Sequence, residues 1–252
     1  MAVAQDRIAL VTGAGRGLGL ACARALLDAG NRVAATDVAA PSPDLFPANM
    51  RDRVMCAPLN VTDTAGAEEL LAKIRKTWGP LGILINNAGI SPKKEDGSSR
   101  KLLEVPPGEL EHVMDVNLTA ALELSRLAVA HMRELGWGRI VNMASLAGRG
   151  RTRVAGPTYA ISKGAIVGLT RCMANEFGPW GITANSIAPG RILSDMVLMA
   201  GEEVNRAYAE VIPLKRLGTP EEVGAVAAFL ASEGAGFVNG TIIDVNGGSY
   251  MP

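Results

Sequence analysis

A tyrosine and a lysine four residues apart, Tyr159 and Lys163, have the types and spacing needed for proton chemistry. Residues at this spacing share one face of a helix, so the phenol and the ammonium can point into the same site. A free tyrosine has a pKa of about 10, which is too high for efficient proton transfer near neutral pH, and a neighbouring cation lowers it. The pair can therefore act as a general acid and base. An ordinary surface pair on a helix is the alternative, because this spacing is common.

A glycine-rich stretch near the start of the chain has the composition of a phosphate-binding turn. It lies between residues 7–12, an apolar run expected to be a buried strand, and an alanine- and leucine-rich helix that should end near Ala29. Glycines let the backbone approach a pyrophosphate, and a helix N-terminus favours its negative charge. A plain turn is the alternative, because the glycine spacing is not that of the G-x-G-x-x-G fingerprint. The residues expected at this site are Gly13, Arg16, Gly17, Leu18 and Gly19.

Two residues bear on the choice of nicotinamide dinucleotide. Asp37 ends the second expected strand, residues 32–37, where a carboxylate can bind an adenosine ribose and would repel a 2′-phosphate. The simpler interpretation is a polar strand end. Arg16 acts in the opposite direction, since its guanidinium can pair with that phosphate. We weigh the carboxylate more heavily, because its position faces the ribose directly, and we expect NAD(H) in preference to NADP(H).

Strands and helices alternate along the chain, and the strands are apolar almost throughout. This pattern indicates a parallel sheet covered by helices on both faces. No linker interrupts it, so we expect residues 1–252 to form one doubly wound α/β domain, with 91–100 as a mobile surface stretch. Further strands are expected at 53–59, 83–85, 139–143, 182–188 and 241–245, and helices at 64–78, 107–135, 157–177, 194–210 and 220–231.

Composition argues against several other classes of protein. The 25 basic and 25 acidic residues balance, so no overall charge attracts the chain to nucleic acid or to an anionic membrane. Cys22, Cys56 and Cys172 suit reduced, buried thiols of an intracellular protein, and no His/Cys cluster indicates a metal. His112 and His131 are expected on a helix face. We see no signal peptide and no apolar run of membrane-spanning length, and expect a cytoplasmic location.

An ordered set of motifs runs through the chain: Thr12-Gly13-(x)3-Gly17-Leu18-Gly19, Asn86-Asn87-Ala88-Gly89, Asn117, Ser145, Tyr159-(x)3-Lys163 and Pro189-Gly190. This set resembles the short-chain dehydrogenase/reductase family in its shorter, single-domain branch, and the resemblance covers nearly the whole chain. It implies a Rossmann-like doubly wound parallel sheet of seven strands. It also implies a nicotinamide cofactor lying across the carboxyl ends of the strands.

The resemblance implies a role for each matching residue. Tyr159 would be the general acid/base, and Lys163 would hold the nicotinamide ribose and lower the pKa of Tyr159. Ser145 would hydrogen-bond the substrate oxygen, and Asn117 would place a water that relays protons from Lys163. Two donors at that oxygen suit the negative charge that hydride transfer to a carbonyl develops. The further cofactor contacts implied are Asn60 and Val61 at the adenine, Asn87, Ala88 and Gly89 on the adenosine side, and Pro189, Gly190, Ile192 and Ser194 near the nicotinamide.

We therefore expect an oxidoreductase that transfers a hydride between NAD(H) and a small secondary alcohol or ketone. The alternative is an NADPH-dependent 3-oxoacyl-(acyl-carrier-protein) reductase, because segments such as 59–63, 216–218 and 246–251 look like those enzymes. Asp37 counts against it, and so does Asn175, where those reductases often carry an arginine for the carrier protein. A non-catalytic dinucleotide-binding regulator is a third hypothesis, weakened by the complete catalytic tetrad.

Three alternating arginines, Arg149, Arg151 and Arg153, follow the serine and can attract an anionic substrate group. A solvated loop or a subunit contact explains them equally well. Met196 and Met199 can form an apolar lid over the pocket or pack a short helix. Relatives are commonly tetramers that pair their long helices, and the small residues along 156–170 permit such contacts, so we expect a homotetramer.

Overall fold

The chain is described by a computed structural model that covers residues 6–150, 154–193, 197 and 201–251. Seven parallel strands form one sheet in the order β3-β2-β1-β4-β5-β6-β7. The strands are β1 (Ile8–Thr12), β2 (Arg32–Asp37), β3 (Val54–Pro58), β4 (Ile83–Asn86), β5 (Gly138–Met143), β6 (Ile182–Pro189) and β7 (Ile242–Val245). The doubly wound seven-stranded fold is thereby confirmed. The strand order reverses between β1 and β4, which is where open α/β sheets bind their ligands.

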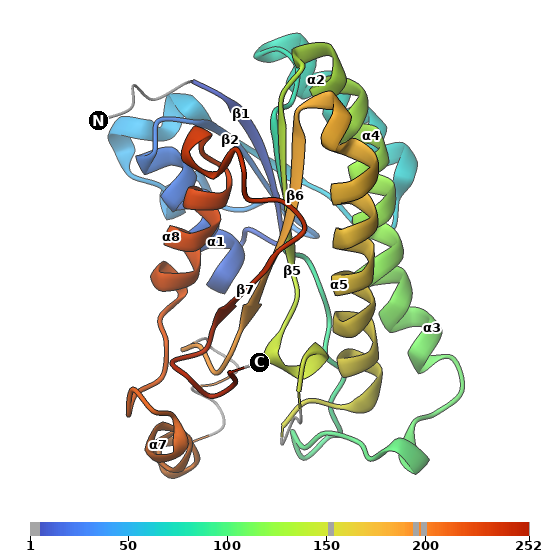
Figure 1. Cartoon of the computed structure of the whole chain (residues 1–252), viewed down its shortest axis with the longest axis vertical. Helices are drawn as coiled ribbons and strands as arrows, with labels where there is room; N and C mark the ends of the chain where they lie inside the picture. The colour runs from blue at the N-terminus through green and yellow to red at the C-terminus, as the bar shows by residue number, and fades with distance from the viewer. Residues whose placement is uncertain (1–5, 151–153, 194–196, 198–200, 252) are drawn as a thin grey trace.

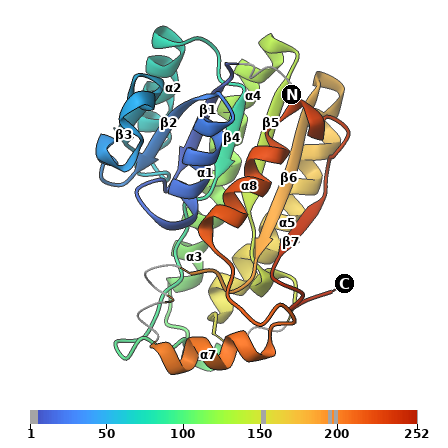
Figure 2. The same cartoon turned by 90° about the vertical axis from the view of Figure 1, so that its left-hand side faces the viewer.

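Helices cover both faces of the sheet (Figure 1). One face carries α1 (Gly17–Asp28) and α8 (Pro220–Leu230), and the other carries α2 (Thr64–Thr77), α4 (Ala120–Leu135) and α5 (Pro157–Phe177). The helix α3 (Glu109–Met114) leads into α4, and α7 (Glu202–Val211) lies across the carboxyl end of the sheet (Figure 2). Among the helices that the structure describes, none combines the length and apolar character needed to cross a membrane. Short 3₁₀ helices are η1 (Pro43–Leu45), η2 (Ala48–Arg53), η3 (Leu102–Glu104), η5 (Leu146–Gly148), η6 (Gly178–Trp180) and η7 (Glu233–Ala235).

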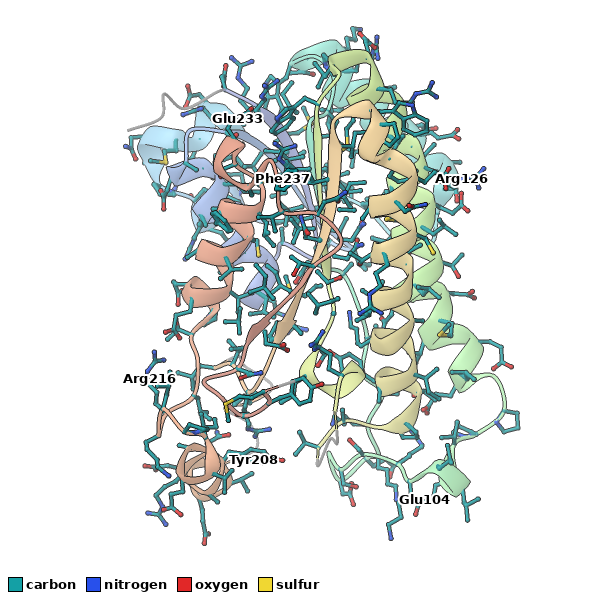
Figure 3. All side chains as sticks on the ribbon, in the orientation of Figure 1. Glu104, Arg126, Tyr208, Arg216, Glu233 and Phe237 are labelled. Atoms are coloured by element: carbon teal, nitrogen blue, oxygen red, sulfur yellow. The ribbon has the colours of Figure 1, made fainter. Side chains whose placement is uncertain are left out.

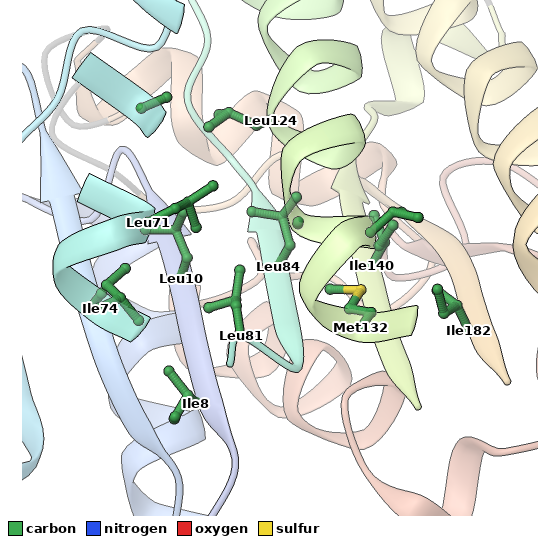
Figure 4. Packing of buried hydrophobic residues seen from close by; sticks show 14 of the residues in the cluster. Ile8, Leu10, Leu71, Ile74, Leu81, Leu84, Leu124, Met132, Ile140 and Ile182 are labelled. Carbon is green, nitrogen blue, oxygen red and sulfur yellow. The ribbon is translucent and has the colours of Figure 1, made fainter. Parts of the chain in front are cut away.

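The core forms on both faces because successive strand residues point to opposite sides. In β1, Ile8 and Leu10 pack against α2 and α4, whereas Ala9 and Val11 pack against α1 and α8. Figure 4 shows the first of these clusters, with Leu84 of β4 near its centre. Each fully buried aliphatic side chain contributes roughly 1.5–3 kcal/mol. Packing on both faces thus stabilises the sheet. The carboxyl ends of its strands are not covered by these two clusters of helices and can carry a functional site.

Two predicted helices differ from their expected form. The helix expected at 107–135 contains a five-residue π-helix, η4 (Asp115–Thr119), between α3 and α4. Such bulges are frequent at functional sites. The helix expected at 194–210 is interrupted at Gly201, whose φ of 90° is not helical; α7 starts after it at Glu202, and Val197 before it is helical. Residues 194–196 and 198–200 lie outside the described part.

Three smaller expectations are refined by the structure. Cys22 is buried and Cys56 is half-buried, but Cys172 is exposed on α5, so the prediction of a buried thiol is wrong there. His112 and His131 lie on helices as predicted, and His131 Nδ1 accepts a hydrogen bond from the Leu81 N–H at 3.2 Å. The stretch 91–100 forms neither helix nor strand, yet Lys93 Nζ and Ser99 Oγ both donate hydrogen bonds to the Val154 carbonyl in the segment before α5.

Replacement of Leu84 by alanine tests the role of the core. Leu84 is fully buried, so Leu84→Ala should lower the free energy of unfolding by about 2–5 kcal/mol through lost burial and a residual cavity. Leu103, 99% exposed on η3, is the matched control, and Leu103→Ala should change it by less than about 0.5 kcal/mol. Urea denaturation measures both. Equal effects of the two variants would contradict the assignment of the core.

Candidate active site

Three of the predicted catalytic side chains meet where β5 ends and α5 begins. Ser145 caps η5, and its Oγ accepts a hydrogen bond from the Ala147 N–H at 3.1 Å. The Ser145 side chain lies close enough to the Tyr159 phenol to act on its pKa, which it lowers. Lys163 lies one turn further along α5, with Nζ 5.7 Å from the centre of the Tyr159 ring. Since Lys163 is only 4% exposed, the pair is not an ordinary surface pair.

The π-helix brings the fourth predicted residue, Asn117, to the same place. Its Oδ1 accepts a hydrogen bond from the Ile90 N–H at 2.7 Å, and its Nδ2 donates to the Ile90 carbonyl at 3.0 Å and to Ser162 Oγ at 2.9 Å. A Cβ added at Gly89 would lie 3.0 Å from Asn117 Oδ1 and 3.4 Å from Lys163 Nζ. Gly89 therefore lets the loop that follows β4 approach Asn117 and Lys163 closely.

Burial controls the protonation of this site. It lowers the pKa of Lys163 from 10.5 to about 8, although Nζ donates a 2.6 Å hydrogen bond to the Met143 carbonyl. It raises the pKa of Tyr159, and the Ser145 side chain opposes that rise only in part. The predicted lowering of the Tyr159 pKa by Lys163 is therefore wrong for the chain by itself. Loss of water around the phenolate is the larger effect, and Lys163 is not among the groups that oppose it.

The glycine turn has the shape of a phosphate cradle. Gly13 and Gly17 have φ angles of 65° and 53°, a region that only glycine adopts readily. A Cβ at Gly19 would overlap the carbonyl oxygen of Gly13. Because α1 begins at Gly17, its unpaired N–H groups face this turn. The residues present thus fit the pyrophosphate of a dinucleotide.

Asp37 ends β2 directly beside the turn. Its Oδ2 accepts a hydrogen bond from the Gly15 N–H at 3.0 Å, and its Oδ1 accepts one from the Val38 N–H at 2.8 Å. The carboxylate is therefore held against the turn, at the place where an adenosine ribose would lie. Arg16, at the N-cap of α1, is exposed and makes no capping hydrogen bond with its side chain.

Strand β4 is joined to the glycine turn through Thr12, which the sequence analysis gave no separate role. Thr12 Oγ1 accepts hydrogen bonds from the N–H groups of Asn87 and Ala88 at 3.1 and 3.0 Å. Asn87 Nδ2 donates to the carbonyls of Thr12 and Gly13 at 2.9 and 3.1 Å. A hydroxyl at the end of an otherwise apolar strand is the signal that could have identified Thr12.

The other residues predicted to touch the cofactor follow the ends of β3 and β6 or line α1. Gly190 donates its N–H to the Val245 carbonyl at 2.9 Å, and Ile192 is buried in the core on the α1 side. This group consists of Leu18, Asn60, Val61, Pro189, Gly190 and Ile192. Ser194 lies outside the described residues, as do Met196, Met199, Arg151 and Arg153.

Arg149 is engaged within the chain. Its Nε lies 3.2 Å from Asp244 Oδ1, and its guanidinium lies over the ring of Tyr250, 5.3 Å from the centroid. The side chains of Arg149 and Asp244 are only 14% and 16% exposed. Asp244 of β7 therefore neutralises the charge of Arg149. Arg149 is neither a solvated loop residue nor a residue that contacts the substrate.

Comparisons with known proteins identify the family. A family model described as enoyl-(acyl carrier protein) reductase matches residues 13–250. The 3-oxoacyl-[acyl-carrier-protein] reductase FabG of Haemophilus influenzae is 36% identical over 248 residues, which cover 98% of this chain and 99% of that protein. The chain belongs to the short-chain dehydrogenase/reductase family.

Solved structures agree with this assignment. A 3-oxoacyl-[acyl-carrier protein] reductase from Brucella melitensis matches with a TM-score of 0.90 and 36% identity, covering 99% of this chain and 93% of that one. Another structure of such a reductase from Brucella melitensis, with bound NAD, matches with a TM-score of 0.87 and 36% identity, covering 98% and 92% of the two chains. The predicted family is confirmed. The chain is an oxidoreductase of this family, whose members bind NAD(H) or NADP(H).

The buried ammonium of Lys163 predicts a pH-dependent stability. Its pKa is about 8 in the folded chain and 10.5 when exposed, so between these values the unfolded chain binds more protons. The folded state therefore gains stability as pH rises through this window, by up to about 1.4 kcal/mol per pH unit. A Lys163→Met variant lacks this gain. Its stability relative to the wild type should be highest below pH 8 and should fall between pH 8 and 10.

Urea denaturation of both proteins at several pH values measures this difference. Cys22 and Tyr159, whose pKa values are raised by burial, destabilise the folded state at high pH and so act in the opposite direction. They are present in both proteins, so their contributions cancel in the comparison. A difference that does not change with pH would show that Lys163 titrates as an exposed lysine.

Proposed function

We propose that this chain transfers a hydride between NAD(H) and a secondary alcohol or ketone, with Tyr159 as the general acid and base. The observation that carries this proposal is the position of the Tyr159 phenol, next to the Ser145 side chain and 5.7 Å from the buried Nζ of Lys163. Two neighbouring hydroxyls can converge on one substrate oxygen. That oxygen becomes negative as a hydride reaches the carbonyl carbon, so donors fixed in advance lower the barrier.

Each side chain would take one part of the reaction. In reduction, Tyr159 gives its proton to the carbonyl oxygen, and a raised pKa keeps the phenol protonated until then. Lys163, with a pKa of about 8, can exchange a proton near neutral pH and restore the phenol. Asn117, held by the Ile90 backbone, would place a relaying water. When bound, the nicotinamide supplies or accepts the hydride.

The preference for NAD(H) is supported by Asp37. Its carboxylate rests against the Gly15 N–H, where it can bind ribose hydroxyls and repel a 2′-phosphate. The glycines of the turn would hold the pyrophosphate, and the segment from Asn87 to Gly89 would border the adenosine side. The preference is also supported by a similar reductase from Brucella melitensis, whose structure contains bound NAD.

A second candidate function is favoured by the relatives. Several of them are named 3-oxoacyl-[acyl-carrier-protein] reductases, so reduction of a 3-oxoacyl thioester with NADPH is the alternative. Asn175, exposed on α5, offers no positive charge to an acidic carrier protein. Ketones, sugars, hydroxy acids and acyl thioesters, assayed in parallel with NADH and NADPH, separate the two functions.

We further propose that residues 1–252 act as one catalytic domain on a small-molecule substrate and assemble as a homotetramer. The single seven-stranded sheet supports one domain, since every strand contributes to the same edge. For the tetramer, Ile161 of α5 is 47% exposed, and a Cβ at Gly168 would meet nothing within 4 Å. The outer face of this helix is thus open to close packing by another helix.

Removal of the phenol hydroxyl tests the mechanism. Tyr159→Phe should lower kcat/KM for ketone reduction by about 10²–10⁴-fold, the usual contribution of a general acid. Its affinity for NADH, measured by fluorescence titration, should remain. Tyr250→Phe is the matched control, because Tyr250 meets Arg149 through its ring, and it should keep its activity. Retention of most activity by Tyr159→Phe would rule out this mechanism.

Replacement of Asp37 tests the cofactor preference. The wild type should have a higher kcat/KM with NADH than with NADPH. Asp37→Ala should lower the value for NADH and raise it for NADPH, because a ribose acceptor and a repulsive charge are both lost. Glu69→Ala, at an exposed carboxylate of α2, should change neither. Equal or higher efficiency of the wild type with NADPH would contradict the preference.

A further inference from the structure

Two cations, Lys93 and Arg191, lie on the loops that follow β4 and β6. Lys93 comes three residues after Ile90, whose backbone holds Asn117. Arg191 directly follows Gly190, beyond the end of β6. Parallel strands end at the same edge of a sheet, so both loops leave the edge that carries the catalytic residues. The two cations are close enough that the charge of Arg191 contributes to a lowered pKa of Lys93.

Within the described part of the chain, Lys93 is held by neutral oxygen atoms. Its Nζ donates hydrogen bonds to Ser99 Oγ and to the Val154 carbonyl, both at 2.7 Å. An ammonium has three N–H donors, so one remains for a ligand. Val154 lies in the segment that leads into α5 and to Tyr159. Lys93 is therefore fixed next to the catalytic segment with its positive charge uncompensated by these partners.

Arg191 is also held by neutral groups. Its Nη2 donates to Asn205 Oδ1 at 2.9 Å, and its guanidinium lies 4.2 Å from the centre of the Tyr208 ring. Both partners belong to α7, the helix across the carboxyl end of the sheet, and Figure 3 labels Tyr208 there. The Nε atom of Arg191 is buried and has no hydrogen-bond partner among the described residues.

Neighbouring cations are neutralised in a different way. Lys94 pairs with Glu104 at 2.7 Å and Arg100 with Glu109 at 2.9 Å. Within the ranges that the structure describes, no carboxylate forms an ion pair with Lys93 or Arg191. Two like charges that are partly withdrawn from water and near each other destabilise the site, and an anion placed with them would offset both effects.

We propose that Lys93 and Arg191 together bind an anionic group of the substrate, a carboxylate or a phosphate. The planar guanidinium suits two-point binding of either group, and the ammonium adds a compact charge. The substrate is then a ketone or alcohol that carries such an anion. This proposal rests on the proposed function and extends it to the substrate class. It also assigns the anion site to cations other than Arg149, which β7 neutralises.

Matched pairs of ketones test the site. Acetoacetate is compared with methyl acetoacetate, and dihydroxyacetone phosphate with dihydroxyacetone, using NADH and the full chain. The wild type should prefer the charged member of at least one pair, and that pair identifies carboxylate or phosphate as the anion. In Lys93→Met and Arg191→Met, the ratio of kcat/KM for the charged over the neutral member should fall about 10- to 100-fold, as expected for hydrogen bonds to charged groups.

Charge-conserving and remote variants serve as controls. Lys93→Arg and Arg191→Lys should retain most of the preference. Lys94→Met, beside Lys93 but paired with Glu104, should leave the ratio unchanged, as should Arg126→Met on the outer face of α4 (Figure 3). An equal loss with charged and neutral ketones would overturn the proposal. So would a matching rise in the Kd for NADH, because the cations would then hold the cofactor pyrophosphate.

A binding measurement separates this proposal from the proposed function. If the wild type reduces none of the ketones, the proposed function fails, and calorimetric titration of the full chain with malonate and with inorganic phosphate decides the anion site alone. Binding of either probe to the wild type, lost in the variant that combines Lys93→Met and Arg191→Met, supports the site. Absence of binding to the wild type, or equal binding to both proteins, overturns it.

Discussion

Burial of the Lys163 ammonium against the end of β5 is the interaction on which the site depends. The Met143 carbonyl accepts a 2.6 Å hydrogen bond from Lys163 Nζ. The last residue of β5 thereby fixes the position of the first turns of α5. A Cβ at Gly148 would overlap the backbone of Lys163, which means that η5 lies directly on α5. This contact brings Ser145, at the start of η5, onto Tyr159. Displacement of either element would separate the two hydroxyls.

A buried polar network keeps these elements in register. Asn86 Nδ2 donates to Asn142 Oδ1 at 2.8 Å, and Asn142 Nδ2 donates to Thr170 Oγ1 at 3.0 Å. Thr170 Oγ1 in turn lies 2.6 Å from Ser186 Oγ. The chain of contacts joins β4, β5, α5 and β6 beneath the site. Polar groups buried in this way tolerate few alternative arrangements, because an unpaired partner is costly.

Charge is distributed unevenly along the carboxyl edge of the sheet. The half-buried carboxylate of Asp37 lies at the glycine turn, where we propose that the adenosine ribose binds. The cations Lys93, Lys163 and Arg191 lie at the other end, on elements that follow β4, β5 and β6. A dinucleotide can extend between these ends, with its ribose on the carboxylate and its reactive ring near the cations. The same gradient favours an anionic partner at the substrate end.

Apolar runs, glycine spacing and the Tyr159/Lys163 interval are local features. They were therefore sufficient to predict the sheet, the glycine turn and the four candidate catalytic residues. The sequence also predicted α5 over its full length. Contacts between distant parts of the chain are needed to explain the π-helix around Asn117, the pairing of Arg149 with Asp244 and the direction of the Tyr159 pKa shift. The proximity of Lys93 and Arg191 likewise depends on the tertiary structure. Burial and charge neutralisation arise from contacts between residues far apart in the chain. The spacing of residues along the sequence does not predict such contacts.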